Sequence, residues 1–422
     1  MNSVIASDIK GIFRSLKNRN YRLFFYGQGI SLIGTWMQSV ALNWLLFRIT
    51  GSAFMLGIAT FAGQFPIFLL APVAGVIGDR FDRRKILIAV QIAAMLQAFT
   101  LAFITFSDIV QPWHIISLTL LLGVINSFEM PVRHAIVFDL LDNKNDLSNA
   151  IALNSSLFNG ARLIGPALAG LIVASSGEAV CFFINAMSYF ATIVAFYFVR
   201  IINGNTLKNR SNLFSEIKEG FAYARGQSPV RELLLLVSLI SFFALTFPVL
   251  LPIFASEVLK GNSHTFGFLV SSAGAGAFCA TLYLASRKNI NGLVNVVKFA
   301  LFVLSFAFIV FSFSKFVLLS MLTLFFVGFT SIVVIASCNT ILQSVVDDQK
   351  RGRIMSLYVM AFTGTAPLGG FISGTVSEYI TAPWTIFASG VCCLFMAVFF
   401  LSFLPEVTCD EKNVRFGSGC ES

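Results

Sequence analysis

The sequence predicts an all-α integral membrane fold with twelve transmembrane helices, from the scarcity of charge, the length of the apolar runs and the placement of charges between them. Charged residues make up 12% of the 422-residue chain and hydrophobic residues 57%, whereas a soluble domain carries roughly 25% charged residues. A soluble protein of this composition would expose an apolar surface large enough to cause aggregation. Lipid is therefore the expected solvent for most of the chain.

Twelve apolar runs are long enough to cross a bilayer, which requires about 20 mostly apolar residues in a helix. In chain order the predicted spans are 22–47, 52–77, 86–107, 114–135, 149–173, 180–200, 231–256, 264–285, 294–314, 317–341, 354–376 and 383–404. The eighth run is the one most diluted by serine and glycine, which suit close packing between membrane helices.

A polar stretch at 201–230 divides the runs into two sets of six. The predicted organisation is a basic arm (1–21), an N-terminal six-helix bundle (22–200), a linker (201–230), a C-terminal six-helix bundle (231–404) and a tail (405–422). Within the linker, the pattern from Leu213 to Arg225 is that of an amphipathic helix on the membrane surface. The polar tail is predicted to be disordered.

Lysine and arginine lie almost entirely on one side of the predicted helices. The net charge is +9, and 25 of the 29 Lys and Arg residues fall on the side of the two termini, against three on the other side. Because positively charged loops stay in the cytoplasm, a multi-pass protein of the bacterial inner membrane with both termini cytoplasmic is predicted. Clusters that set topology in this way do not indicate nucleic-acid binding.

The loop between the second and third runs carries the clearest motif. Its sequence, GVIGDRFDRRK from Gly75 onward, resembles the G-x-x-x-D-R-x-x-R-R signature of the major facilitator superfamily. The resemblance implies two six-helix bundles and a gating motif of Gly75, Asp79, Arg80, Arg83 and Arg84. Gly75 is expected to let a neighbouring helix approach closely, and Asp79 to accept a bond from Arg83. Arg84 is expected to matter less, and the alternative is that all these cations only set orientation.

Further segments resemble the branch that contains enterobactin exporters and predicted efflux permeases. They are Asn20–Phe24, Ser31–Gln38, Pro131–Ala135 and Asn149–Gly170. Gly165 and Pro166 are similar to the glycine-proline motif of antiporters, and Pro367 lies in the corresponding segment of the second half. This likeness implies a helix-bend motif and favours export, although the full glycine pattern is not met and the second half lacks the Gly-Asp framework of the gating loop.

Polar side chains form stripes on several predicted helices, and such stripes must avoid lipid. At 100° per residue, one face of the first helix carries Gln28, Ser31, Thr35 and Gln38. The cavity candidates are this stripe with Asn126 in the first half, and Thr246, Thr323 and Thr330 in the second. For each residue the alternative is that its amide or hydroxyl group holds helices together.

Two charges inside the predicted first bundle point to proton coupling. A charge near the bilayer centre costs roughly 2.5 kcal/mol or more, so Glu129 and Arg162 require an explanation. Side chains lean toward the helix N-terminus, which is expected to bring Arg162 toward Glu129. Either the two form a static pair, or Glu129 is a carboxylate that binds and releases a proton, with Asp139 as a further candidate. The second half is expected to have no carboxylate within its spans.

The leading hypothesis is a proton-coupled exporter, or antiporter, of a bulky amphipathic small molecule such as a siderophore or a drug. A lysophospholipid transporter, an uptake permease of the same fold and a sensor with a transporter fold remain alternatives. The chain has no H-E-x-x-H, G-x-S-x-G or G-x-x-x-x-G-K-[ST] motif, so neither an enzyme nor an ATP-driven pump is expected. The 7 Cys and 3 His residues show no metal-ligand spacing, and a monomer without cofactor or obligate protein partner is expected.

Overall fold

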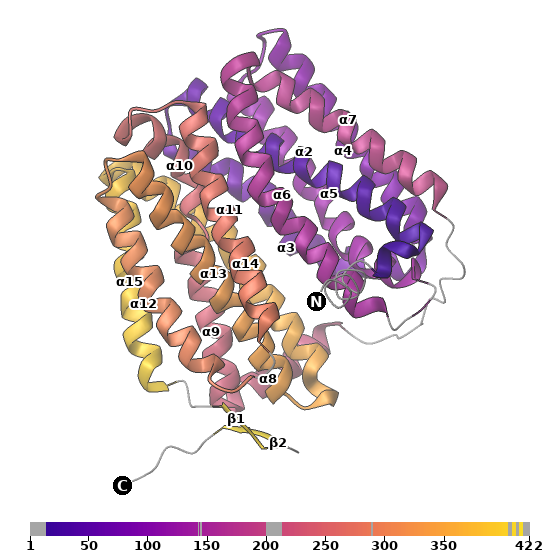
Figure 1. Cartoon of the computed structure of the whole chain (residues 1–422), viewed down its shortest axis with the longest axis vertical. Coiled ribbons are helices and arrows are strands. Elements are labelled where there is room, and N and C mark those ends of the chain that lie inside the picture. The colour runs from indigo at the N-terminus through magenta and orange to yellow at the C-terminus, as the bar shows by residue number, and fades with distance from the viewer. Residues whose placement is uncertain are drawn as a thin grey trace, which may run out of the picture. The chain divides into compact units, whose positions relative to one another are not determined.

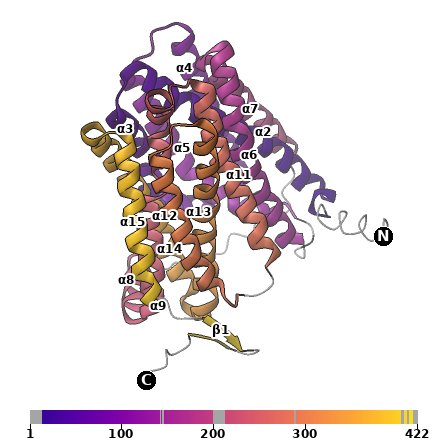
Figure 2. The same cartoon turned by 60° about the vertical axis from the view of Figure 1, so that its left-hand side comes forward.

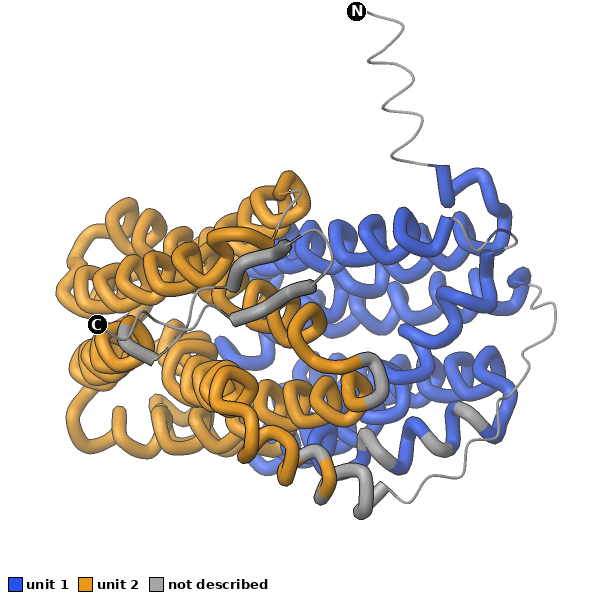
Figure 3. The backbone as a smooth tube through the Cα atoms, turned by 90° about the horizontal axis from the view of Figure 1, so that it is seen from below, with its two compact units in different colours: residues 1–49, 65–208 blue, residues 50–64, 209–422 orange. Residues whose placement is uncertain are grey.

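The computed structural model describes residues 14–141, 143, 146–199, 213–287, 290–403, 407–410 and 413–416. Within these residues, 12 helices are long and apolar enough to cross a membrane, as the sequence predicts. The chain folds into two compact units (Figure 3), unit 1 with Met1–Ile49 and Phe65–Lys208, and unit 2 with Thr50–Gln64 and Asn209–Ser422. Residues 50–64 therefore group with unit 2 and not with the N-terminal half to which the sequence assigns them.

Unit 1 is a bundle of long helices preceded by a short 3-10 helix (Figure 1). In chain order it contains η1 (Arg14–Lys17), α2 (Arg19–Thr50), the second part of α3 (Ala53–Arg80), α4 (Arg83–Phe106), α5 (Pro112–Asp139), α6 (Leu147–Ser176) and α7 (Glu178–Phe198). Glycines on α2 allow α7 to approach, because a Cβ atom at Gly27 would lie 2.7 Å from Ala195 Cβ. Aromatic rings of Tyr21, Phe24 and Phe196 fill the core at one end of this helix pair.

Unit 2 contains the amphipathic helix of the linker and the second set of spans. In chain order it contains α8 (Leu213–Gly226), α9 (Ser228–Phe243), η3 (Phe247–Val249), α10 (Leu251–Ile253), η4 (Phe254–Val258), α11 (Ser263–Ser286), α12 (Leu293–Ser312), α13 (Val317–Val345), α14 (Asp348–Ile380) and α15 (Ala382–Phe403). The predicted surface helix of the linker is thus α8, and the rest of the linker up to residue 212 lies outside the described residues.

The seventh predicted span is interrupted, whereas its apolar composition predicts one continuous helix over 231–256. Regular helix α9 ends at Phe243, and the chain continues through η3, α10 and the π-helical turn η4. Pro248 and Pro252 lie in this segment, and proline lacks the N–H donor that a regular helix needs at each position. Apolar composition predicts that the segment spans, but the two prolines prevent a continuous helix.

The first turns of α3 pack on α14 within unit 2. A Cβ atom at Gly57 would lie 3.2 Å from the carbonyl oxygen of Gly370, and one at Gly374 would lie 2.6 Å from the carbonyl oxygen of Ala53. Phe371 packs between Phe54 and Phe61, with ring centroids 5.8 and 6.0 Å apart. Small residues thus let the two backbones approach, and the aromatic rings fill the flanks of the contact.

The tail differs from the disorder that its polar composition predicts. Val407–Asp410 (β1) pairs antiparallel with Asn413–Phe416 (β2), with Val407 opposite Phe416. Figures 1 and 2 both show this hairpin at the same end of unit 2 as α8. Strand-forming residues occur in both strands, namely valine and threonine in β1 and valine and phenylalanine in β2, and they favour the paired conformation.

Candidate functional site

The loop between α3 and α4 is held by hydrogen bonds within unit 1. Asp82 caps the N-terminus of α4, where its carboxylate accepts hydrogen bonds from the backbone N–H groups of Arg84 and Lys85 at 2.9 and 3.3 Å. Arg83 Nη1 pairs with Asp139 Oδ2 at 2.8 Å, and Arg83 Nε donates to the carbonyl oxygen of Gly78 at 3.3 Å. The structure therefore places Asp139, a predicted coupling candidate, against the gating loop at the end of α5.

Arg84 binds the C-terminal end of α7, which the sequence does not predict. Its Nε donates to the carbonyl oxygen of Phe196 at 2.7 Å, and its Nη2 to that of Tyr197 at 2.6 Å. The last carbonyl groups of a helix have no partner inside the helix and carry partial negative charge. Arg84 thus caps α7 in addition to any effect of its charge on topology, and the expectation that it matters less for transport than Asp79 stays a prediction.

We expect Arg84→Ala to lower the free energy of unfolding by about 1.5–3 kcal/mol, the usual worth of hydrogen bonds from a charged donor. Thermal unfolding of the purified protein in detergent measures this. Arg80→Ala is the matched control, because Arg80 lies at the end of α3, on the other side of the same loop, with an exposed side chain. Equal stability changes in the two variants would show that the hydrogen bonds of Arg84 to α7 do not stabilise the protein.

Within unit 1, the close helix approach next to this loop is made at Gly78 and not at Gly75. A Cβ atom at Gly75 would meet no described heavy atom within 4 Å, whereas one at Gly78 would lie 3.0 Å from Val132 Cγ2 on α5. The closely packed glycine of this loop is therefore Gly78. Asp79 lies in α3, but its side chain is outside the described residues, so its predicted bond to Arg83 stays a prediction.

Glu129 pairs with a residue of its own helix. Arg133 Nε lies 3.6 Å from Glu129 Oε1, and the two side chains are 8% and 15% exposed, in the order Arg133, Glu129. The spacing of four residues places the two side chains on the same face of α5. Arg133 Nε makes no hydrogen bond in the described structure, so the pair is an ion pair without a directional bond.

Arg162 lies over an aromatic ring instead of pairing with Glu129. Its guanidinium carbon is 5.6 Å from the ring centroid of Trp36 on α2, a cation–π contact. Phe158 packs edge-on against the same ring, and a Cβ atom at Gly165 would lie 2.6 Å from Trp36 Cβ. Because this face of α6 is directed at α2, the predicted partnership between Arg162 and Glu129 is corrected.

The helix-bend motif is embedded in uninterrupted helices. Pro166 lies inside α6 and Pro367 inside α14, and both helices continue through the proline. Gly165 serves the close approach of α6 to α2 at Trp36. Bending at these prolines stays a prediction.

The polar stripe of α2 is mostly engaged inside unit 1. Gln38 Nε2 donates to Gln97 Oε1 at 3.1 Å, Asn185 Nδ2 donates to Gln38 Oε1 at 2.8 Å, and Gln97 Nε2 donates to the carbonyl oxygen of Leu118 at 3.2 Å. This buried chain of amides ties α2, α4, α5 and α7 together. In this structure Gln38 thus holds helices together, and its contact with a substrate stays a prediction.

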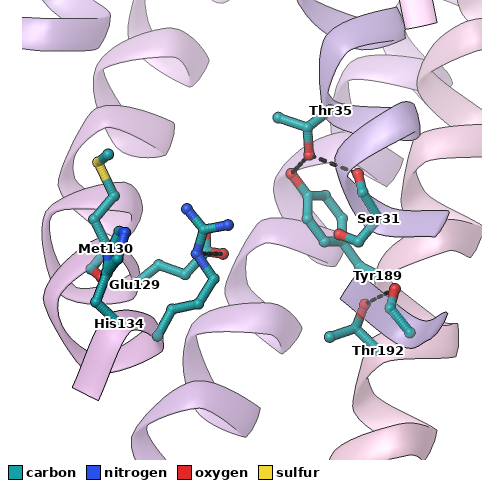
Figure 4. Close-up of polar contacts among 9 residues, drawn as sticks. Ser31, Thr35, Glu129, Met130, His134, Tyr189 and Thr192 are labelled. Atoms are coloured by element: carbon teal, nitrogen blue, oxygen red, sulfur yellow. Dashed lines mark hydrogen bonds and ion pairs between the residues drawn. The ribbon is translucent and has the colours of Figure 1, made fainter. Parts of the chain in front are cut away.

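Thr35 lies between two hydroxyl-bearing neighbours (Figure 4). Its Oγ1 donates to the carbonyl oxygen of Ser31 at 2.9 Å and lies 3.3 Å from Tyr189 Oη on α7. Gln28 and Ser31 are each 2% exposed, so neither presents a surface to solvent in this structure. Thr35 and Asn126 are half-buried, and they remain the candidates of unit 1 for contact with a substrate.

The threonine candidates of unit 2 are buried and bond to carbonyl groups of their own helices. Thr246 is 4% exposed, Thr323 6% and Thr330 3%. The Oγ1 of Thr323 donates to Leu319 and Ser320, and that of Thr330 to Phe326 and Val327. Thr246 also contacts Ser373 Oγ at 3.2 Å. In this structure these side chains bond within unit 2, and their contact with a substrate stays a prediction.

Unit 2 contains carboxylates within its helices, contrary to the expectation from sequence. Glu232 on α9 is 6% exposed, and its Oε2 is buried without a hydrogen bond. Glu378 on α14 accepts hydrogen bonds from Ser52 Oγ and from the backbone N–H of Phe54, both at 3.2 Å. Glu232 lies at the start of the predicted span 231–256, so the expectation overlooks it. Glu378 lies two residues past the predicted span 354–376, because α14 continues to Ile380.

Comparison with known proteins covers nearly the whole chain. A family model described as transmembrane secretion effector matches residues 10–416. The staphyloferrin A transporter of Staphylococcus aureus is 25% identical over 93% of this chain and 98% of its own length. Macrolide efflux protein A of Streptococcus pyogenes is 25% identical over 68% of this chain and 72% of its own. The structure of a bacterial homolog of the human lysosomal transporter Spinster has a TM-score of 0.72 at 12% identity, over 90% of this chain and 95% of that one.

Proposed function

The chain belongs to the transmembrane secretion effector family of the major facilitator superfamily, and from that membership we propose that it is a proton-coupled exporter of a bulky amphipathic small molecule, such as a siderophore or a drug. The chain is a multi-pass membrane transporter and not an enzyme, as are the proteins it matches. The match over nearly the full length of a staphyloferrin A transporter supports a siderophore, and the macrolide efflux relative supports a drug. The proposed location is the bacterial inner membrane, with both termini in the cytoplasm.

The observation that carries proton coupling is the buried ion pair between Glu129 and Arg133. Glu129 lies ten residues before the end of α5 at Asp139, or about 15 Å at 1.5 Å per residue. A carboxylate at this depth is costly unless it is paired or protonated, and such residues often mark proton relays in transporters. The long contact of 3.6 Å and the unbonded Nε of Arg133 leave room for an exchange of partners.

In the proposed cycle, a proton and Arg133 compete for Glu129. Protonation neutralises the carboxylate, which removes the ion pair and leaves the guanidinium of Arg133 with its donors unpaired. Polar or anionic groups of a substrate then have a cation to bind, whereas loss of the proton returns Arg133 to Glu129. The two states differ by a single charge inside unit 1, which is enough to bias a two-state equilibrium between conformations.

Transport in reconstituted liposomes tests the proposal. We expect a pH gradient to drive accumulation of a siderophore or a macrolide in everted membrane vesicles and in liposomes of the same orientation, and collapse of the gradient to stop it. A wild-type protein that moves neither compound, or moves them without response to the gradient, would contradict the proposal. Movement of a lysophospholipid in the same assay would favour the lipid-transport alternative.

A further inference from the structure

A small cavity lies between α8 and the first turns of α14, both in unit 2. Its volume is about 270 Å³, and it is lined by Glu219, Ala222, Tyr223, Lys350, Arg353 and Ile354. Glu219, Ala222 and Tyr223 are spaced by three and four residues, so they lie on one face of α8, and this face turns toward α14. Ile354 is buried, and the remaining α14 residues bring positive charge to the cavity.

Three hydrogen-bond donors of different chemistry converge on this space. Lys350 Nζ lies 4.4 Å from the centroid of the Tyr223 ring, a contact that leaves its three N–H groups available. Arg353 Nη1 pairs with Glu219 Oε2 at 2.8 Å, and the guanidinium has further donors beyond that bond. The hydroxyl of Tyr223, which also lines the cavity, carries a proton that it can donate to a ligand.

The charge balance of the cavity favours an anion. Glu219 is neutralised by Arg353, which leaves Lys350 as the further positive charge among the residues that line the cavity. Burial raises the pKa of the Tyr223 hydroxyl, and the negative charge of nearby Asp347 raises it further. The phenol therefore stays protonated at neutral pH. Among the residues that line the cavity, Lys350 and Arg353 outweigh Glu219 by one positive charge.

The position of the cavity identifies the source of the anion. α14 is one of the helices able to cross the membrane, and the cavity lies at its N-terminal end, where lipid headgroups are found. On the face of α8 away from the cavity, Phe221 is 58% exposed and Arg225 is also exposed. Aromatic and basic side chains on such a helix are typical of residues at the boundary between lipid and water.

We propose that the cavity between α8 and α14 binds the phosphate headgroup of an anionic phospholipid, with Lys350, Arg353 and Tyr223 as donors. Basic pockets beside membrane helices on the cytoplasmic side are known to hold such headgroups. A bound headgroup fastens α8, the helix of the linker between the two sets of spans, to unit 2. The proposal is independent of what the protein transports, because it rests on the cavity alone.

Thermal unfolding of the full-length protein in detergent tests the site, with phosphatidylglycerol, phosphatidylcholine or inorganic phosphate added. We expect phosphatidylglycerol to raise the unfolding midpoint of the wild type and of Arg225→Gln, and to leave that of Lys350→Gln unchanged. Arg225→Gln removes the same charge from the opposite face of α8, so it separates this cavity from general attraction to a basic surface. Native mass spectrometry should show phosphatidylglycerol retained by the first two proteins and lost from Lys350→Gln.

Three outcomes would overturn the proposal. An equal rise for all three proteins would mean that the lipid acts through the surface charge as a whole. A rise with phosphatidylcholine as large as that with phosphatidylglycerol would exclude recognition of the anion. An equal rise with inorganic phosphate would identify a free anion, and not a lipid, as the ligand.

Discussion

Glu129→Gln is expected to lose accumulation driven by a pH gradient while keeping substrate binding and exchange. Glutamine has the shape and hydrogen-bonding capacity of a protonated glutamate but cannot release a proton, so a step that requires the charged carboxylate stops. Binding and exchange require no net proton movement, and they should continue. Transport in reconstituted liposomes, measured with and without a pH gradient, separates the two activities.

The ion pair between Glu178 and Arg48 supplies the control. Glu178 Oε1 lies 2.9 Å from Arg48 Nε, and its side chain is 7% exposed, so it is a buried, paired carboxylate of the same unit. Glu178→Gln should keep export driven by a pH gradient. Loss of that activity in both variants would mean that breaking any buried pair of unit 1 is enough to stop transport.

A purely structural pair makes a different prediction for the double variant. If Glu129 and Arg133 only stabilise unit 1, either single substitution costs stability because it leaves a buried charge unpaired. Glu129→Gln combined with Arg133→Met should then recover both folding and transport. Export driven by a pH gradient in this double variant would rule out Glu129 as the coupling residue.

Valine at Gly276 or Gly328 is expected to prevent unit 2 from folding. A Cβ atom at Gly276 would collide with the carbonyl oxygen of Phe325, and one at Gly328 with that of Ala273. Gly276 lies on α11 against the backbone of α13, and Gly328 lies on α13 against the backbone of α11. Backbone atoms cannot rotate away as a side chain can. Overpacking in a core costs about 1–3 kcal/mol when side chains can adjust, and here the whole helix has to move.

Fluorescence-detected size exclusion of the solubilised protein measures the outcome. Both variants should give little monodisperse protein, whereas Gly160→Val should behave like the wild type, because a Cβ atom at Gly160 meets no described heavy atom within 4 Å. Well-folded Gly276→Val protein at wild-type yield would show that α11 and α13 can separate without loss of the fold.

The sequence alone determined the number of transmembrane helices and the family. Helix propensity and hydropathy are local properties, and a spanning helix satisfies its own backbone groups, so each run of about 20 apolar residues predicts its own structure. The interruption of the seventh span could also have been predicted from the sequence, because Pro248 and Pro252 both lie in it. The segment nevertheless has the hydropathy of a continuous span, because phenylalanine, leucine and valine surround both prolines.

The tertiary structure alone decided which polar groups meet. Periodicity gives the face of a helix on which Gln38, Arg162 or Thr330 lies, but not the neighbour that this face meets. Arg162 and Glu129 looked like partners because opposite charges inside a membrane attract, yet Trp36 lies beside the first and Arg133 beside the second. Arg84 caps α7 through carbonyl groups 112 and 113 residues away in the chain. Such partners depend on how helices rotate and pack against each other, and this is fixed by glycines and side-chain volumes distributed over the whole unit.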